Sequence, residues 1–136
     1  MANNPFAAYH VTGTTTADPV TLTTMLYDGT LKALRKSRMH LEAGNRQGFH
    51  DETNRAYLII GELRSTLDLG QGELAEGLAA IYGYCLRLLV EASMGDSAKI
   101  VEVEGHIGKI ADAWRAATAQ LKTAQAAGRS GAEAAA

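Results

Sequence analysis

The chain has 136 residues, of which 46 % are hydrophobic and 21 % are charged, and its formal net charge is -2. This composition predicts one globular domain with a sizeable core, and the scattered basic residues argue against a nucleic-acid partner. No apolar run is long enough to span a bilayer, so membrane insertion is not expected. The single cysteine, Cys85, indicates a reducing compartment, and the opening "MANNPFAAYHV" lacks a signal-peptide pattern, so we expect a cytoplasmic protein.

The first 17 residues are predicted to form a mobile arm in front of the folded domain. A short apolar stretch, Pro5 to Val11, is followed by the polar and turn-prone "TGTTTADP". Within that stretch, Asp18 predicts a helix N-cap and Pro19 the first helical residue. Residues 1–17 are therefore interpreted as a flexible arm and linker.

Three segments with helical periodicity follow, and a break that contains glycine ends each of them. The first runs from Pro19 to Gly44, the second ends at "LGQG", and the third runs from about Glu73 to "MGD". The third helix has an apolar seam, which means a row of apolar residues in steps of three and four. Its members are Leu74, Leu78, Ile81, Cys85, Leu88 and Ala92. Such a seam is the side by which a helix packs in a bundle.

The fourth helix follows Asp96 and has the most regular seam in the chain. Its members are Ile100, Val103, Ile107, Ile110, Trp114, Ala117, Leu121 and Ala124. Four helices with short connections and one seam each predict an all-α protein, an antiparallel four-helix bundle over residues 18–127. No segment alternates with a period of two, so no strands are expected. The apolar pattern is lost near the end, which predicts a disordered tail over residues 128–136.

The second and third helices have more apolar surface than their seams require. A bundle helix needs roughly a third of its circumference to be apolar. The additional apolar residues are Tyr57 and Leu58 on the second helix and Ala75, Ala79, Tyr82, Leu86, Leu89 and Val90 on the third. One interpretation is a deeply buried central helix. The other is a groove for an apolar helix or an extended peptide, which Phe6 and Tyr9 of the arm would cover when the groove is empty.

The sequence contains no constellation of residues that is typical of an enzyme. None of the four histidines has a second histidine three or four residues away, so no metal or cofactor site is expected. Cys85 lies on a helix seam without a nearby basic group, which favours core packing over nucleophilic chemistry. One chemical alternative stays open. His106 with Lys109 has the spacing seen in four-helix histidine-phosphotransfer domains, although Ile110 stands where those domains usually have glycine.

Several motifs in this order resemble the FliS family, the flagellar export chaperones for flagellin. They begin with "AAY" at residues 7–9 and "ADPVTLTTMLYDGTLKAL" at 17–34. They continue with "RAYLIIGEL", "GELAEGL", "IYGYCLRLLVEAS" and "EVEGHIGKIADAW". The resemblance covers about residues 6–117. The chain departs from the family at Gly77, Gly83 and Ser93, where the family often has Asn, Asp and Asn.

The resemblance implies a cytoplasmic chaperone that binds the disordered C-terminal segment of flagellin, keeps flagellin monomeric and delivers it to the flagellar type III export apparatus. It also implies that the arm, with Phe6 and Tyr9, lies over the hydrophobic surface and moves when flagellin binds. The predicted flagellin-binding residues are Phe6, Tyr9, Tyr57, Leu58, Tyr82, Leu86, Leu89 and Val90. A structural bundle that self-associates as a homodimer through the third helix is a further alternative.

Overall fold

A computed structural model describes residues 18–135 of the chain, with side chains described up to residue 129. The elements are helix α2 (Pro19–Glu42), helix α3 (Arg46–Ser65), the 3-10 turn η1 (Leu69–Gln71), helix α4 (Glu73–Ser93) and helix α5 (Lys99–Ala135). These residues contain no strand, which confirms the all-α prediction.

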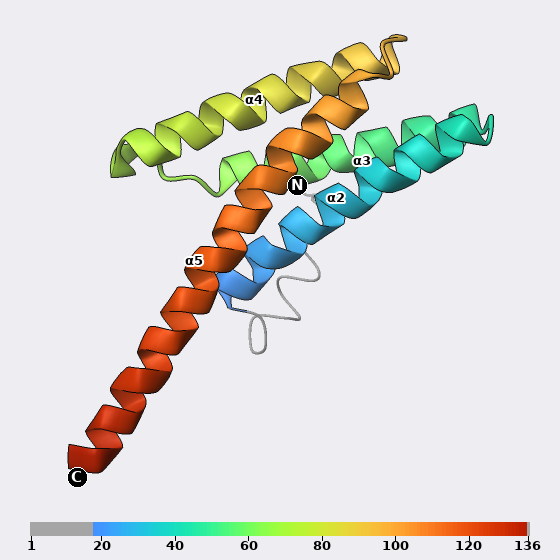
Figure 1. Cartoon of the computed structure of the whole chain (residues 1–136). Helices are drawn as coiled ribbons and strands as arrows, with labels where there is room; N and C mark the ends of the chain where they lie inside the picture. The colour runs from blue at the N-terminus through green and yellow to red at the C-terminus, as the bar shows by residue number, and fades with distance from the viewer. Residues whose placement is uncertain (1–17, 136) are drawn as a thin grey trace.

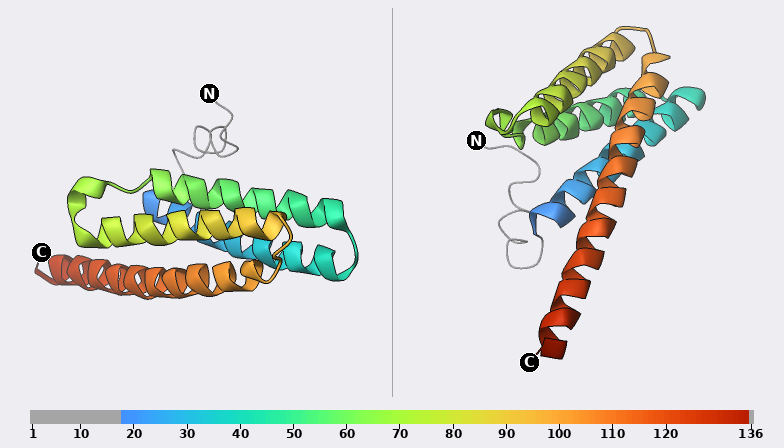
Figure 2. Two further views of the ribbon diagram at one scale, coloured as in Figure 1. Left: turned by 90° about the horizontal axis from the view of Figure 1, so that it is seen from above. Right: turned by 60° about the vertical axis from the view of Figure 1, so that its left-hand side comes forward.

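The four helices form an antiparallel bundle in which each helix packs against two others. The neighbouring pairs are α2 with α3, α3 with α4, α4 with α5, and α5 with α2. Figure 1 shows that each helix runs opposite to the one before it, and Figure 2 shows the same order from two other sides. This arrangement is the one predicted from the short connections.

The helix ends lie where local residue chemistry predicts them. The Asp18 carboxylate accepts a hydrogen bond of 2.7 Å from the backbone N–H of Thr21, which caps α2, and Pro19 is the first helical residue. At the other end of α2, Gly44 has a φ of 75°, a left-handed conformation that glycine adopts without steric cost. The Asn45 side chain then caps α3 by accepting a hydrogen bond of 3.0 Å from the N–H of Gly48.

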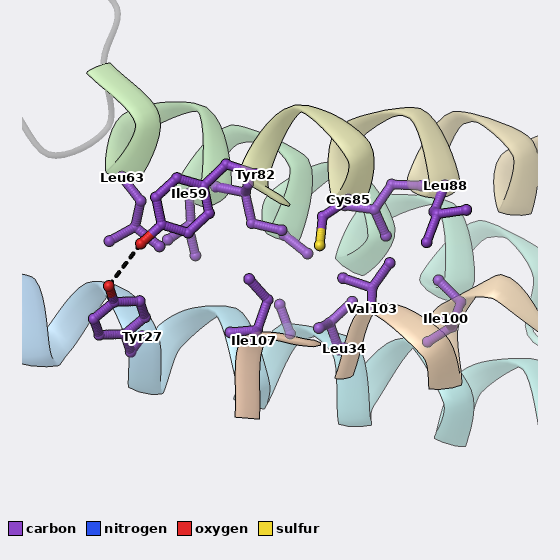
Figure 3. Packing of buried hydrophobic residues seen from close by; sticks show 14 of the residues in the cluster. Tyr27, Leu34, Ile59, Leu63, Tyr82, Cys85, Leu88, Ile100, Val103 and Ile107 are labelled. Atoms are coloured by element: carbon purple, nitrogen blue, oxygen red, sulfur yellow. Dashed lines mark hydrogen bonds between the residues drawn. The ribbon is translucent and has the colours of Figure 1, made fainter. Parts of the chain in front are cut away.

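The core consists of apolar side chains from all four helices that pack against one another (Figure 3). Helix α5 contributes Ile100, Val103 and Ile107, all fully buried, as its seam predicts. Helix α3 contributes Ile60 and Leu63, and the other buried apolar residues are Leu26, Tyr27, Ala33, Leu34, Phe49, Ala56, Ile59, Tyr82, Cys85, Leu88, Leu89, Ala92 and Ala111.

Helix α4 is buried along part of its predicted seam, at Cys85, Leu88 and Ala92, but the seam is wrong at its start and too narrow. Tyr82 and Leu89, predicted to lie on the additional apolar face, are each only 1 % exposed, so their predicted exposure is wrong. Leu74 and Ile81, predicted to lie on the seam, are 77 % and 37 % exposed. The buried side of α4 is wider than the predicted seam and includes Tyr82 and Leu89, because α4 is apolar around most of its circumference. Leu74 and Ile81 are exposed because they precede Tyr82, and no described side chain in that part of α4 is buried.

An aromatic layer of three residues ends the core. The hydroxyls of Tyr27 on α2 and Tyr82 on α4 form a buried hydrogen bond of 2.6 Å across the bundle (Figure 3). The Trp114 ring on α5 lies 6.1 Å from the Tyr27 ring, and its N–H donates to Thr24 Oγ1 at 2.8 Å. Among the described side chains, none on α4 before Tyr82 and none on α5 after Ala111 is buried. Past the aromatic layer, α4 and α5 diverge (Figure 1).

The end of α5 lies further along the chain than predicted. Residues 128–136 were expected to form a disordered tail, but α5 continues as a helix to Ala135 (Figure 1). The last part of α5 is rich in alanine, which has the strongest helix propensity. Loss of the apolar pattern therefore does not mark the end of the helix.

We expect the two tyrosine hydroxyls to depend on each other. Tyr27→Phe or Tyr82→Phe alone leaves one buried hydroxyl without its partner and should lower the free energy of unfolding by about 1–3 kcal/mol. The double variant should lose less than the sum of the two. Urea unfolding followed by circular dichroism gives these values, and strictly additive losses would contradict the interaction.

The same variants test a pH dependence. Burial raises the pKa of both phenols, so each folded-state pKa lies above the unfolded value of about 10. Their contribution to stability is therefore complete below pH 10 and is lost as the pH rises above it. The free energy of unfolding of the unaltered chain should fall more steeply above pH 10 than that of the double Phe variant, and equal slopes would contradict this.

Cys85 should be unreactive in the folded protein. The side chain is fully buried, and burial raises the pKa of its thiol to about 11, whereas the thiolate is the reactive form. At pH 8, alkylation by iodoacetamide should be far slower in buffer than in concentrated urea, where the same thiol is exposed. A native chain alkylated as fast as the unfolded chain would show that the core is open at this position.

Candidate functional site

Exposed apolar residues gather where α3 and α4 lie side by side. On α3, Tyr57, Gly61 and Arg64 share one side of the helix, because they are spaced by four and three residues. A Cβ placed on Gly83 of α4 would lie 3.7 Å from Cζ of Arg64, so these two residues face each other. The helices are antiparallel, so Tyr57, seven residues before Arg64, faces Val90, seven residues after Gly83.

We call this surface the α3–α4 face. On the α4 side it consists of Ala79, Gly83, Leu86 and Val90, and on the α3 side of Tyr57, Gly61 and Arg64. Val90 is 46 % exposed and Tyr57 is 38 % exposed, whereas Leu86 is partly buried against the core. Nothing lies within 4 Å of a Cβ placed on Gly61, so there is open space at this position between the larger side chains.

The structure separates the predicted flagellin-binding residues into four groups. Tyr57, Leu86 and Val90 come together on the α3–α4 face. Leu58 is 48 % exposed but lies one residue further round α3, on its outer side. Tyr82 and Leu89 belong to the core and are not available to a partner in the folded bundle. Phe6 and Tyr9 lie outside the described residues.

A second apolar surface, which the sequence interpretation missed, lies where α4 and α5 diverge. Leu74 and Ile81 of α4 and Leu121 of α5 are exposed there, and we call this surface the α4–α5 face. All three were predicted to be seam residues. The signal that could have revealed the surface is the length of the α5 seam, which extends further than the shorter helices α2 to α4 can cover.

A polar cluster joins α4 and α5 close to this surface. Tyr84 donates a hydrogen bond of 2.7 Å to Oε2 of Glu102, and Nε2 of His106 lies 3.4 Å from the same oxygen. The hydrogen bond from Tyr84 is the main cause that lowers the pKa of the Glu102 carboxyl. The Arg87 guanidinium lies 5.7 Å from the centre of the Tyr84 ring. The cluster therefore holds an ionised carboxylate beside His106.

A polar pocket lies between the start of α2 and the middle of α5, lined by residues that include Asp18, Thr24 and Lys122. Arg115, also in its lining, forms ion pairs with Asp28 and Asp112. The guanidinium of this pocket is thus already neutralised by two carboxylates.

Within residues 18–129, no three His, Cys, Asp or Glu side chains are grouped so that they could hold a metal ion. No helix of the described chain has the length and apolar character needed to cross a membrane.

Comparison with known proteins identifies the family. A family model described as flagellar protein FliS matches residues 1–121. The flagellar secretion chaperone FliS of Bacillus subtilis (strain 168) is 36 % identical over 115 residues, which cover 84 % of this chain and 86 % of that protein. The flagellar secretion chaperone FliS of Escherichia coli (strain K12) is 38 % identical over 97 residues, with 69 % and 71 % covered.

The FliS protein of Salmonella typhimurium (strain LT2) has the same description and is 37 % identical over 102 residues, with 73 % of this chain and 76 % of that protein covered. The chain therefore belongs to the FliS family of flagellar secretion chaperones.

Proposed function

We propose that this chain binds the disordered C-terminal segment of flagellin in the cytoplasm, prevents its premature polymerisation and delivers it to components of the flagellar type III secretion apparatus. The observation that carries the proposal is the exposed apolar surface on both flanks of α4. Val90 is exposed on the side of α3, and Leu74 and Ile81 are exposed on the side of α5. Contiguous apolar surface of this kind is typical of a binding site for a protein segment.

The positions of the two faces favour a client that is disordered before it binds. One straight helix cannot cover the α3–α4 face and the α4–α5 face together, because α4 lies between them. Burying one large apolar side chain contributes about 1.5–3 kcal/mol, whereas ordering a residue costs about 1–2 kcal/mol. A client that follows the surface around α4 can bury several such side chains, which offsets the cost of ordering it.

We further propose that the arm, residues 1–17, shields an apolar face when no client is bound, with Phe6 and Tyr9 as the contacting residues. The arm precedes Asp18 at the start of α2, and it is tethered to the bundle. Tethering raises the effective concentration of the arm near these surfaces. A docked arm would reduce self-association through α4, which is the homodimer alternative.

Catalysis is not part of the proposal. The phosphotransfer alternative would place a phosphoryl group on His106, but Nε2 of this histidine lies 3.4 Å from the carboxylate of Glu102. A phosphoryl group on that nitrogen would be repelled by the like charge. Incubation with acetyl phosphate should therefore leave the chain unlabelled, and a label that disappears in His106→Gln would favour phosphotransfer instead.

The adjacent residues Leu89 and Val90 provide a matched test of flagellin binding. Val90→Glu places a charge on the α3–α4 face and should leave the fold intact while weakening binding about tenfold, the loss of roughly one buried valine. Leu89→Glu buries an unpaired charge and should unfold the bundle. Circular dichroism reports the fold, and isothermal titration with the C-terminal segment of flagellin reports the affinity.

The unaltered chain must bind that segment for the proposal to hold. It should also keep full-length flagellin monomeric in light scattering. Absence of binding would contradict the proposed function, whereas binding that Val90→Glu leaves unchanged would move the site away from the α3–α4 face.

A further inference from the structure

The α3–α4 face contains one cation, Arg64, surrounded by apolar and small residues. A Cβ placed on Gly83 would lie 3.7 Å from Cζ, 3.7 Å from Nη1 and 3.8 Å from Nη2 of Arg64. Three nearly equal distances mean that the flat guanidinium turns one face toward the position that a side chain on residue 83 would occupy. Its N–H donors lie in the plane of the group, so they point along the surface of the protein and away from the core.

Arg64 has no acidic partner in the described part of the chain. Three other arginines do: Arg38 pairs with Glu104, Arg55 with Glu52, and Arg115 with Asp28. Within residues 18–129, no carboxylate oxygen lies within 4.0 Å of a nitrogen of Arg64. The guanidinium thus lies beside the side-chain position of Gly83, and its donors have no carboxylate partner among these residues.

A segment bound on this face would exclude water from Arg64. Its apolar side chains would pack on Tyr57, Leu86 and Val90, and the guanidinium lies in the same surface, seven residues along α3 from Tyr57. Removing water from an arginine costs free energy when no partner replaces the water. An arginine that gains a carboxylate instead forms a strong charge-assisted hydrogen bond. The face therefore discriminates between segments by what they place opposite Arg64.

We propose that Arg64 is a specificity-determining residue of the client site, and that it pairs with an Asp or Glu side chain of the flagellin segment bound on the α3–α4 face. The inference rests on the proposed function and adds to it the chemistry of one client residue. A single cation among apolar residues fits one carboxylate on an apolar segment. Planar, two-pronged hydrogen bonding makes arginine well suited to that group.

Gly83 allows a test that leaves Arg64 in place. The three heavy atoms nearest to its Cβ position all belong to the Arg64 guanidinium, at ordinary contact distance, so a small side chain can be added there. Gly83→Asp introduces the residue that the FliS family often has at this position, and in this chain it would give Arg64 a carboxylate of its own that competes with the client for the guanidinium. Gly83→Asn has nearly the same shape without the charge and is the matched control.

The experiment is isothermal titration of the full chain with the C-terminal segment of flagellin, for the unaltered protein, Arg64→Gln, Gly83→Asp and Gly83→Asn. Arg64→Gln and Gly83→Asp should each weaken binding about tenfold, the loss of one charge-assisted pair. Gly83→Asn should bind within about twofold of the unaltered chain, since a factor of two is a small fraction of such a pair. Added salt should weaken binding of the segment to the unaltered chain more than it weakens binding to Arg64→Gln.

Thermal unfolding without client separates this role from a structural one. Arg64 lies in the last turn of α3, where a cation also stabilises the helix end. Arg64→Gln with a lower melting temperature but unchanged affinity would overturn the inference, and so would unchanged affinity in Gly83→Asp. No binding by the unaltered chain would overturn the proposed function and this inference with it, whereas normal binding by all four proteins would overturn the inference alone.

Discussion

The hydrogen bond between the hydroxyls of Tyr27 and Tyr82 determines where the core of this bundle ends. Both groups are buried, so each needs the other, and this need holds α2 and α4 at a fixed distance across the bundle. Trp114 extends the layer to α5 through its contacts with Tyr27 and Thr24. On one side of the layer all four helices share a dense core. On the other side α4 and α5 diverge (Figure 2), and Leu74, Ile81 and Leu121 remain exposed.

This division separates the residues that fold the protein from those that we propose to bind its client. Residues such as Ile100, Val103 and Ile107 are fully buried and supply the folding energy. Exposed residues such as Leu74 and Val90 contribute little to folding, so the chain can present them without losing the bundle. A chaperone needs this separation, because a surface that stabilised its own fold by closing on itself would not be free for a disordered client.

Local chemistry made much of the fold predictable. The buried side of each helix and the register between neighbouring helices were less predictable. Asp18, Pro19 and Gly44 act on their nearest neighbours, so the ends of α2 could be deduced from the sequence. The extent of the buried side of α4 could not, since Tyr82 and Leu89 are as apolar as the exposed Leu74 and Ile81, and only packing against the other helices distinguishes them. The pairing of Arg64 with Gly83, and hence of Tyr57 with Val90, depends on the register between α3 and α4, which no local pattern contains. For this reason the sequence pattern predicted a common apolar surface that includes Tyr57, Leu86 and Val90, but it did not predict that Arg64 lies beside them.

In the proposed complex, a flagellin segment binds along both sides of α4 while the core behind the aromatic layer stays unchanged. Amide hydrogen exchange measured by mass spectrometry, with and without the C-terminal segment of flagellin, tests this claim directly. In the free protein, we expect amide exchange to be slower in the core part of α5, around Ile100 to Ala111, than at the start of α4. Few buried contacts protect the amides at the start of α4. On binding, exchange should slow most at residues 73–81 of α4 and along the facing part of α5. Bound flagellin that left the exchange of α4 unchanged, with protection confined to other helices, would contradict the account.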